Sequence, residues 1–170
     1  MDKPLNDIYQ VLQKLVGLHR QLLDTVRMER EALVQAELKA IQSATIAKQG
    51  LIEAIRHAEG ERMQLIANLA QAWKRPMRAL TLPQLIIEVQ GRDIKTAELF
   101  RSTFNTLTLL IQRITEQNDD NRAFLEKSLM HVEAMKKNVL GESVPKSNTY
   151  TPKGQRSGPS NGARLISKEA

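Results

Sequence analysis

The chain of 170 residues contains no cysteine, a single tryptophan, and only 4% aromatic residues. The absence of cysteine excludes a disulfide framework, a thiolate metal site and a cysteine nucleophile. The low aromatic content leaves few side chains for the aromatic surfaces on which many ligand sites depend. The 41% of hydrophobic residues are therefore mostly aliphatic, which suits the packing seams between helices.

Motifs of enzymes and of metal or nucleotide sites are also missing from the sequence. The three histidines, His19, His57 and His131, lie far apart and do not have the spacing of metal ligands. Glycine-rich phosphate loops and the nucleophile elbow of hydrolases do not occur. The acidic pair Asp119-Asp120 lacks the glycine and glutamate of a calcium loop. We therefore expect no catalytic residue, no metal and no cofactor.

Long apolar runs are absent as well. No segment approaches the roughly 18 consecutive apolar residues that a membrane-spanning helix requires. The opening sequence MDKPLNDIYQ lacks the basic and apolar regions of a signal peptide. We expect a soluble, cytoplasmic protein with no stable insertion into a membrane.

The net charge of +6 is spread unevenly along the chain. Residues 142–170 carry five basic and two acidic residues, and residues 1–141 carry 20 basic and 17 acidic residues, so each part contributes +3. A nucleic-acid-binding helical protein usually has a denser basic stripe than this. Nucleic acid is therefore not an expected partner.

The strongest pattern predicts a long amphipathic helix from Asp93 to Leu140. Alternating steps of three and four residues visit thirteen positions, ten of them apolar, which is the pattern of a coiled-coil seam. These positions are Ala97, Phe100, Phe104, Leu107, Ile111, Ile114, Asn118, Asn121, Leu125, Ser128, Val132, Met135 and Val139.

Three further helices are predicted before it. Apolar ladders indicate helices over residues 5–34 and 38–73, with a turn at 35–37, although one continuous helix is the alternative. Thr81 is a suitable cap for a short helix that ends near Gly91. The predicted fold is all-α: a long antiparallel helical hairpin, a short helix and a long C-terminal helix in a coiled-coil-like bundle.

The predicted domain organisation is a helical bundle over residues 1–141 followed by a flexible basic tail over 142–170. The tail is rich in Pro, Gly and Ser and has too few apolar residues to form a core, so we expect it to be disordered. Burial cannot explain Tyr150 in such a segment, and we interpret it as a docking anchor.

Helix lengths and seam polarity give two more expectations. At 1.5 Å per residue the final helix is about 70 Å long and the first about 45 Å, so part of the final stripe must overhang, bend or find another partner.

The apolar ladders contain three polar residues, His19, Asn118 and Asn121. We expect them to form a hydrogen-bonded layer that fixes the register of the helices. Leucine at both asparagines is then expected to raise the melting temperature.

The end of the long helix carries an apolar stripe that either packs in the core or binds a partner, and the sequence leaves both alternatives open. Methionine in this stripe adapts to apolar partners of different shape. Its residues are Leu125, Leu129, Val132, Met135, Val139 and Leu140.

Three segments of the sequence carry a family resemblance. They are EREALVQAELKAI with AKQGLIEAI and ER, then NDDNRAFLEKSL, and then TYTPKG. Together they resemble the FlgN family of flagellar type III export chaperones for hook-associated proteins. The first is similar to the opening hairpin of that family, and the second to a run in its last helix. The third is similar to its Tyr-Asp-x-x-Gly element, with Thr151 where Asp is common. The matching positions are Lys48, Leu51, Ile52, Glu61, Arg62, Asn118, Asn121, Leu125, Ser128, Leu129 and Tyr150.

The resemblance implies a cytosolic all-α chaperone that is not an enzyme. It implies binding of the C-terminal amphipathic helices of the hook–filament junction proteins, through the stripe Leu125–Leu140, and their delivery to the flagellar export gate. It also implies that Tyr150 contacts the export gate. The alternative is a structural coiled-coil protein that forms a homo-oligomer through its long C-terminal helix.

Overall fold

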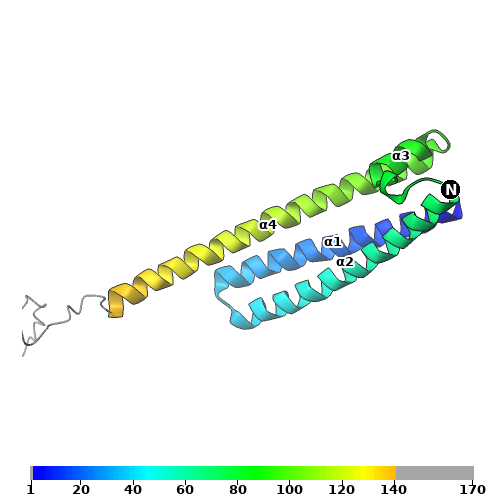
Figure 1. Ribbon diagram of the computed structural model, residues 1–170. Helices are drawn as coiled ribbons and strands as arrows, with labels where there is room; N and C mark the ends of the chain where they lie inside the picture. The colour runs from blue at the N-terminus through cyan, green and yellow to red at the C-terminus, as the bar shows by residue number, and fades with distance from the viewer. Residues whose placement is uncertain (1, 141–170) are drawn as a thin grey trace, which may run out of the picture. The chain divides into compact units, whose positions relative to one another are not determined.

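A computed structural model of the chain describes residues 2–140, and all regular secondary structure in this part of the protein is helical (Figure 1). The all-α prediction is confirmed over these residues, among which no strand occurs. The predicted tail and its boundary after residue 141 lie outside the described residues and stay predictions. The elements are α1 (Lys3–Gln35), α2 (Leu38–Ala72), the 3-10 helix η1 (Met77–Ala79), α3 (Leu82–Gln90) and α4 (Ile94–Leu140).

The chain separates into two compact units, Met1–Lys127 and a second that begins at Ser128. The first unit contains α1, α2, η1, α3 and most of α4. The last turns of α4, from Ser128 to Leu140, are the described part of the second unit. The core described below belongs entirely to the first unit.

The first two helices end in the same way, with a non-glycine residue in the left-handed conformation. Ala36 has a φ of 56° and Lys74 a φ of 51°. After α1, the N–H of Glu37 donates to the carbonyl of Ala32 over 3.0 Å, and after α2 the N–H of Arg75 donates to that of Ala70 over 2.9 Å. These bonds satisfy carbonyls that a helix end leaves without a partner. The predicted turn at 35–37 is confirmed.

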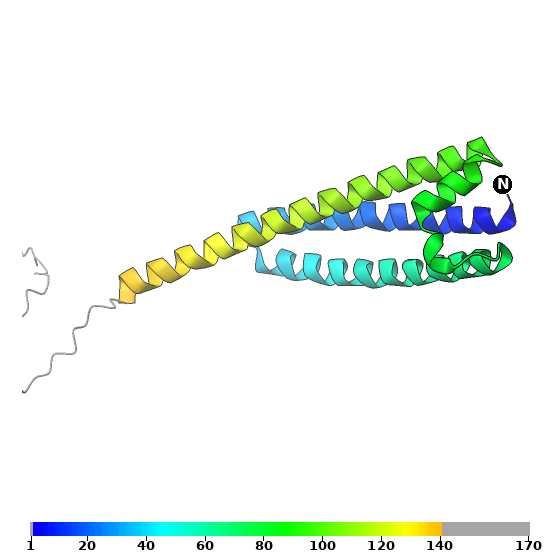
Figure 2. The same ribbon diagram turned by 45° about the horizontal axis from the view of Figure 1, so that its top comes forward.

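Helices α1 and α2 form an antiparallel hairpin (Figures 1 and 2). Most of the larger buried side chains of this hairpin belong to α1. Ile8, Leu15 and Val26 of α1 are fully buried, and their spacing puts them on one face. Three of the five buried residues of α2 are alanines, at Ala44, Ala58 and Ala70. This composition explains why the apolar ladder of α2 is weak in the sequence.

Helix α4 also packs on α1. The ring of Phe100 is fully buried and meets the ring of Tyr9 edge-on, with 6.0 Å between the centroids. Further along, Gln13 donates a hydrogen bond of 2.9 Å to the hydroxyl of Thr103. The buried residues of α4 are Thr96, Ala97, Phe100, Thr103, Leu107, Leu110, Ile114 and Asn121.

The predicted seam of α4 is correct at Phe100 and Leu107 but wrong at alternate positions. Thr103 and Leu110 are buried, whereas Phe104 is half-buried and Ile111 is 49% exposed. From Phe100, the predicted stripe steps by four and then three residues, and the buried stripe by three and then four. The two stripes therefore share every second position, and at the positions between they differ by one residue. The predicted stripe fits the sequence because Phe104 and Ile111 are apolar. In the structure, however, the stripe that contains Thr103 and Leu110 is the buried one.

Asp93 caps the N-terminus of α4. Its carboxylate accepts hydrogen bonds from the Thr96 backbone N–H over 3.1 Å and from the Thr96 hydroxyl over 2.5 Å. The bond from the hydroxyl, and after it the bond from the backbone, lower the pKa of Asp93. A cap of this kind satisfies an amide that the helix itself leaves without a partner.

Replacing Asp93 with Ala is expected to lower the melting temperature at neutral pH. Because the pKa of Asp93 is lower in the folded protein, its ionic contribution is complete above the ordinary Asp pKa and is lost as the pH falls through the folded value. Asp93→Asn keeps a cap acceptor without the charge. Thermal unfolding at several pH values should therefore show the difference between wild type and Asp93→Asn shrinking in acid. A constant difference would contradict the role of the charge.

Candidate functional site

The stripe predicted to bind a partner is exposed over its whole length in the structure. Every side chain from Leu129 to Leu140 is exposed, and the predicted residues Leu129, Val132, Met135, Val139 and Leu140 are all more than half exposed. Leu125, in the first unit, is 46% exposed. Within residues 2–140 this stripe therefore does not pack in a core, and its role in binding a partner stays a prediction.

The spacing of these residues gives the stripe a defined face. Leu129, Val132 and Val139 repeat at intervals of three and seven residues, so their side chains project from one side of α4. Exposed apolar residues are common singly, but a continuous row of them usually marks an interaction site. A row along one helix offers a partner helix the i, i+3, i+7 spacing that helix packing uses.

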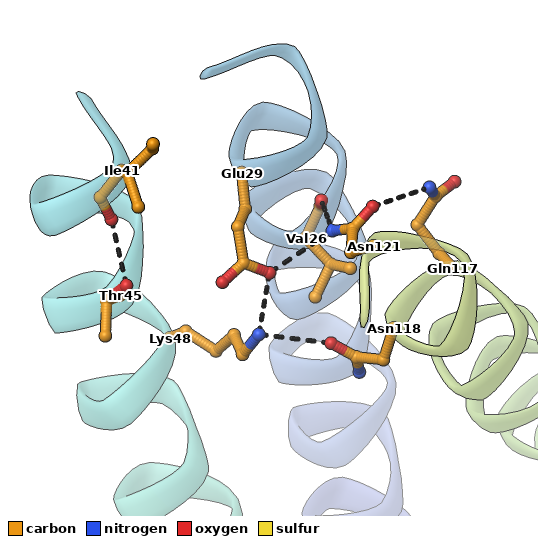
Figure 3. A network of polar contacts seen from close by, with 8 residues as sticks. All are labelled: Val26, Glu29, Ile41, Thr45, Lys48, Gln117, Asn118 and Asn121. Atoms are coloured by element: carbon orange, nitrogen blue, oxygen red, sulfur yellow. Dashed lines mark hydrogen bonds and ion pairs between the residues drawn. The ribbon is translucent and has the colours of Figure 1, made fainter. Parts of the chain in front are cut away.

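A buried polar layer joins α1, α2 and α4 within the first unit (Figure 3). The ammonium of Lys48 donates to the Glu29 carboxylate over 2.7 Å and to the Asn118 side-chain oxygen over 3.1 Å. The amide of Asn121 donates to the same Glu29 oxygen over 3.2 Å and to the Val26 carbonyl over 3.0 Å. One carboxylate therefore connects three helices at one level.

The prediction of a polar layer at Asn118 and Asn121 is confirmed, but the prediction that His19 takes part is wrong. The Nδ1 atom of His19 lies 2.7 Å from the Leu15 carbonyl, one turn earlier in the same helix. The partners of the asparagines are instead Glu29 and Lys48. In the sequence, Lys48 is one of the positions that match the family, but it interrupts the apolar ladder of the second helix, and nothing local connects it with Glu29.

The layer satisfies its charges with hydrogen bonds. The Glu29 side chain is 13% exposed and the Lys48 side chain 24% exposed, so both charges have lost most of their water. An ion pair in such a place is tolerated when further hydrogen bonds complete its coordination. Asn118 and Asn121 supply them, and no buried side-chain nitrogen or oxygen in the described part of the chain lacks a partner.

Replacing Asn121 with Leu is expected to destabilise the protein by about 1–3 kcal/mol, because Glu29 then loses a hydrogen bond in a place with little water. This reverses the expectation from the sequence that leucine raises the melting temperature. Urea unfolding at neutral pH measures the change. Asp119→Leu, on the exposed side of the same helix, is the control and should change stability by about 0.5 kcal/mol or less. Greater stability of Asn121→Leu would contradict the importance of this layer.

Outside the polar layer, most ion pairs of the described chain join exposed side chains. His57 lies 3.1 Å from Glu61, and a hydrogen bond from Lys14 lowers the pKa of that glutamate. His131 is exposed near the end of α4. Among residues 2–140 no group of His, Cys, Asp and Glu is placed to hold a metal. No helix in this range is long and apolar enough to cross a bilayer.

Tyr150, the predicted contact to the export gate, lies outside the described residues, and its role stays a prediction. The third segment of the family resemblance, TYTPKG, lies there as well. The first segment lies in the α1–α2 hairpin and the second in α4. Lys48 of the first segment and Asn118 and Asn121 of the second belong to the polar layer (Figure 3).

Comparison with protein families gives a match over most of the chain. The family model described as FlgN protein covers residues 1–158, which include every helix described above. Comparisons with curated proteins and with solved structures find no match.

Proposed function

Since the chain belongs to the FlgN family of flagellar export chaperones, we propose that its clients are the hook-associated (hook–filament junction) proteins. The chain binds their C-terminal amphipathic helices in the cytoplasm, prevents their premature assembly, and delivers them to the export gate. FlgN is a family of chaperones, not of enzymes, so the proposed function consists of binding, delivery and release of the clients.

The observation that carries the proposal is the exposed apolar stripe of α4. From Leu129 to Leu140 the helix is formed although none of its side chains is buried. A client helix that lies along Leu129, Val132 and Met135 would bury these side chains and its own apolar face together. This is the helix-on-helix mode of peptide recognition, in which a row of apolar residues at i, i+3 and i+7 supplies the contacts.

The same physics explains protection and release. Before assembly, the apolar face of a client helix is exposed, because the subunits that cover it later are not yet present. The chaperone covers this face in their place. Burial of apolar surface contributes about 25 cal/mol per Å², but the costs of association and ordering remove much of this stabilisation. We expect a dissociation constant between about a micromolar and a nanomolar, which allows both holding and later transfer.

Delivery is a separate step in the proposal. Tyr150 contacts the export gate, while the stripe that ends at Leu140 holds the client. The nine residues between Leu140 and Tyr150 separate the two roles along the chain.

Replacing Val132 with Asp is expected to abolish binding of the C-terminal segments of hook-associated proteins, because a carboxylate placed in an apolar contact must lose its water without a partner. Leu129→Asp and Met135→Asp should act in the same way. Co-purification followed by size exclusion with light scattering measures the complex. Circular dichroism should show an unchanged helical content in each variant.

Ala134→Asp is the matched control for Val132→Asp. Both residues are exposed near the end of α4, and they lie about half a turn apart. The control should bind the client as the wild type does. Equal binding by all variants would refute the stripe as the client site. A stable oligomer of this chain that binds no client would support the structural coiled coil instead.

Tyr150→Ala is expected to leave client binding unchanged and to impair delivery, since the tyrosine is proposed to contact the gate rather than the client. Binding is measured by co-purification, and delivery by secretion of the hook-associated proteins in cells that carry the variant. Tyr150→Phe tests whether the ring is sufficient. A loss of client binding in Tyr150→Ala would argue against two separate roles.

A further inference from the structure

A second apolar surface, separate from the stripe of α4, lies inside the first unit. It is a groove of about 790 Å³ with α2 on one side and α4 on the other, and Leu12 of α1 also lines it. We call it the α2–α4 groove. Its apolar lining is Leu12, Met63, Ile66, Pro76, Met77, Leu80, Leu82, Phe104, Leu107 and Ile111.

The groove exists because α2 and α4 both pack on α1. The buried row of α4 that contains Thr103 and Leu110 belongs to the core, which leaves Phe104 and Ile111 to line the groove. Ile111 is 49% exposed, and Met63 on the opposite side is 44% exposed. Methionine fills apolar gaps of irregular shape, so Met63 and Met77 suit a surface that adapts to an occupant.

The surroundings of the groove limit the length of an occupant. Met77 of η1 and Leu80 after it line the groove, and its lining on α4 runs from Phe104 to Ile111. Seven residues beyond Ile111, the hydrogen bond from Lys48 to Asn118 joins α2 to α4. The span from Phe104 to Asn118, about 21 Å along α4, is therefore the upper limit for an occupant and equals about four turns of helix. A helix bound in the groove would lie beside α1, α2 and α4 and would complete a four-helix bundle with them.

The charges at the groove favour an acidic occupant. On its α2 side the charge of Arg62 is balanced by an ion pair of 2.8 Å with Glu59. At the η1 end, Arg78 is exposed and has no ion pair or hydrogen bond within the described residues. A carboxylate at the end of an occupying helix would pair with this guanidinium.

The same charge argues against the chain itself as the occupant. Residues 142–170 have a net charge of +3, and the end of α4 carries Lys136 and Lys137. Either segment would bring further cations to Arg78, where like charges repel.

We propose that the α2–α4 groove binds an amphipathic helix of a partner protein. This helix has three to four turns, apolar residues at i, i+3 and i+7, and an acidic residue at the end that lies over Arg78. The groove is a second docking surface, and it does not depend on client binding by the stripe that contains Val132.

The full chain, labelled with ¹³C at its methionine methyl groups, tests the proposal by NMR. The probe is a peptide of about 16 residues, long enough for four turns, with leucines at i, i+3, i+7 and i+10 and a glutamate at each end. The signals of Met63 and Met77 are expected to shift on titration. The signals of Met28 and Met130, which do not line the groove, should stay in place.

Ile111→Asp should weaken binding of the peptide at least tenfold, because it places a charge in the apolar groove. Leu109→Asp is the matched control: Leu109 is 48% exposed on the same helix but does not line the groove, and its variant should bind as the wild type does. Arg78→Glu should weaken binding of the glutamate peptide about three- to fivefold and strengthen binding of a peptide with lysine at each end by a similar factor.

Three results would overturn the proposal. In the first, the peptide shifts none of the methionine signals. In the second, it shifts Met130 and Met135 but not Met63 and Met77, so that it binds the stripe instead. In the third, the signals of Met63 and Met77 depend on protein concentration without peptide, which would make the groove a contact between copies of this chain. Val132→Asp distinguishes the two surfaces, because it should abolish client binding and leave the peptide titration unchanged.

Discussion

The apolar face of α1 is the surface on which the rest of the first unit depends. Helix α2 packs against it in the hairpin, and α4 packs against it through Phe100 and Thr103. Because one helix supplies the common partner, α2 and α4 do not need to close on each other, and Phe104 and Ile111 are left at the groove between them. At Asn118 a hydrogen bond, not apolar packing, joins α4 to α2.

Much of this fold was predictable from the sequence because long helices leave strong periodic patterns. The ends of α1 and α2 were harder, since left-handed caps usually contain glycine and here contain Ala36 and Lys74. The choice between Phe104 and Thr103 as a seam residue was not predictable at all. Periodicity indicates a face to within about one residue, and only the position of α1 decides which neighbour is buried.

The candidate sites divide in the same way. The stripe from Leu129 to Leu140 was predictable because it depends on local spacing alone. The layer that joins Glu29, Lys48 and Asn121 was only partly predictable, since its residues come from three helices and no local pattern pairs a glutamate with a lysine on another helix. The groove depends on the packing of α2 and α4 on α1, so it was not predicted.

The long exposed end of α4 has a consequence for the backbone as well as for binding. Between Leu129 and Leu140 no buried side chain holds the helix in place, so we expect its main-chain hydrogen bonds to open as easily as those of an isolated helix. Amide protons should exchange with solvent quickly there and slowly around Phe100, within a single continuous helix. A bound client helix would slow the exchange in these last turns, and part of its binding free energy would be used to order them.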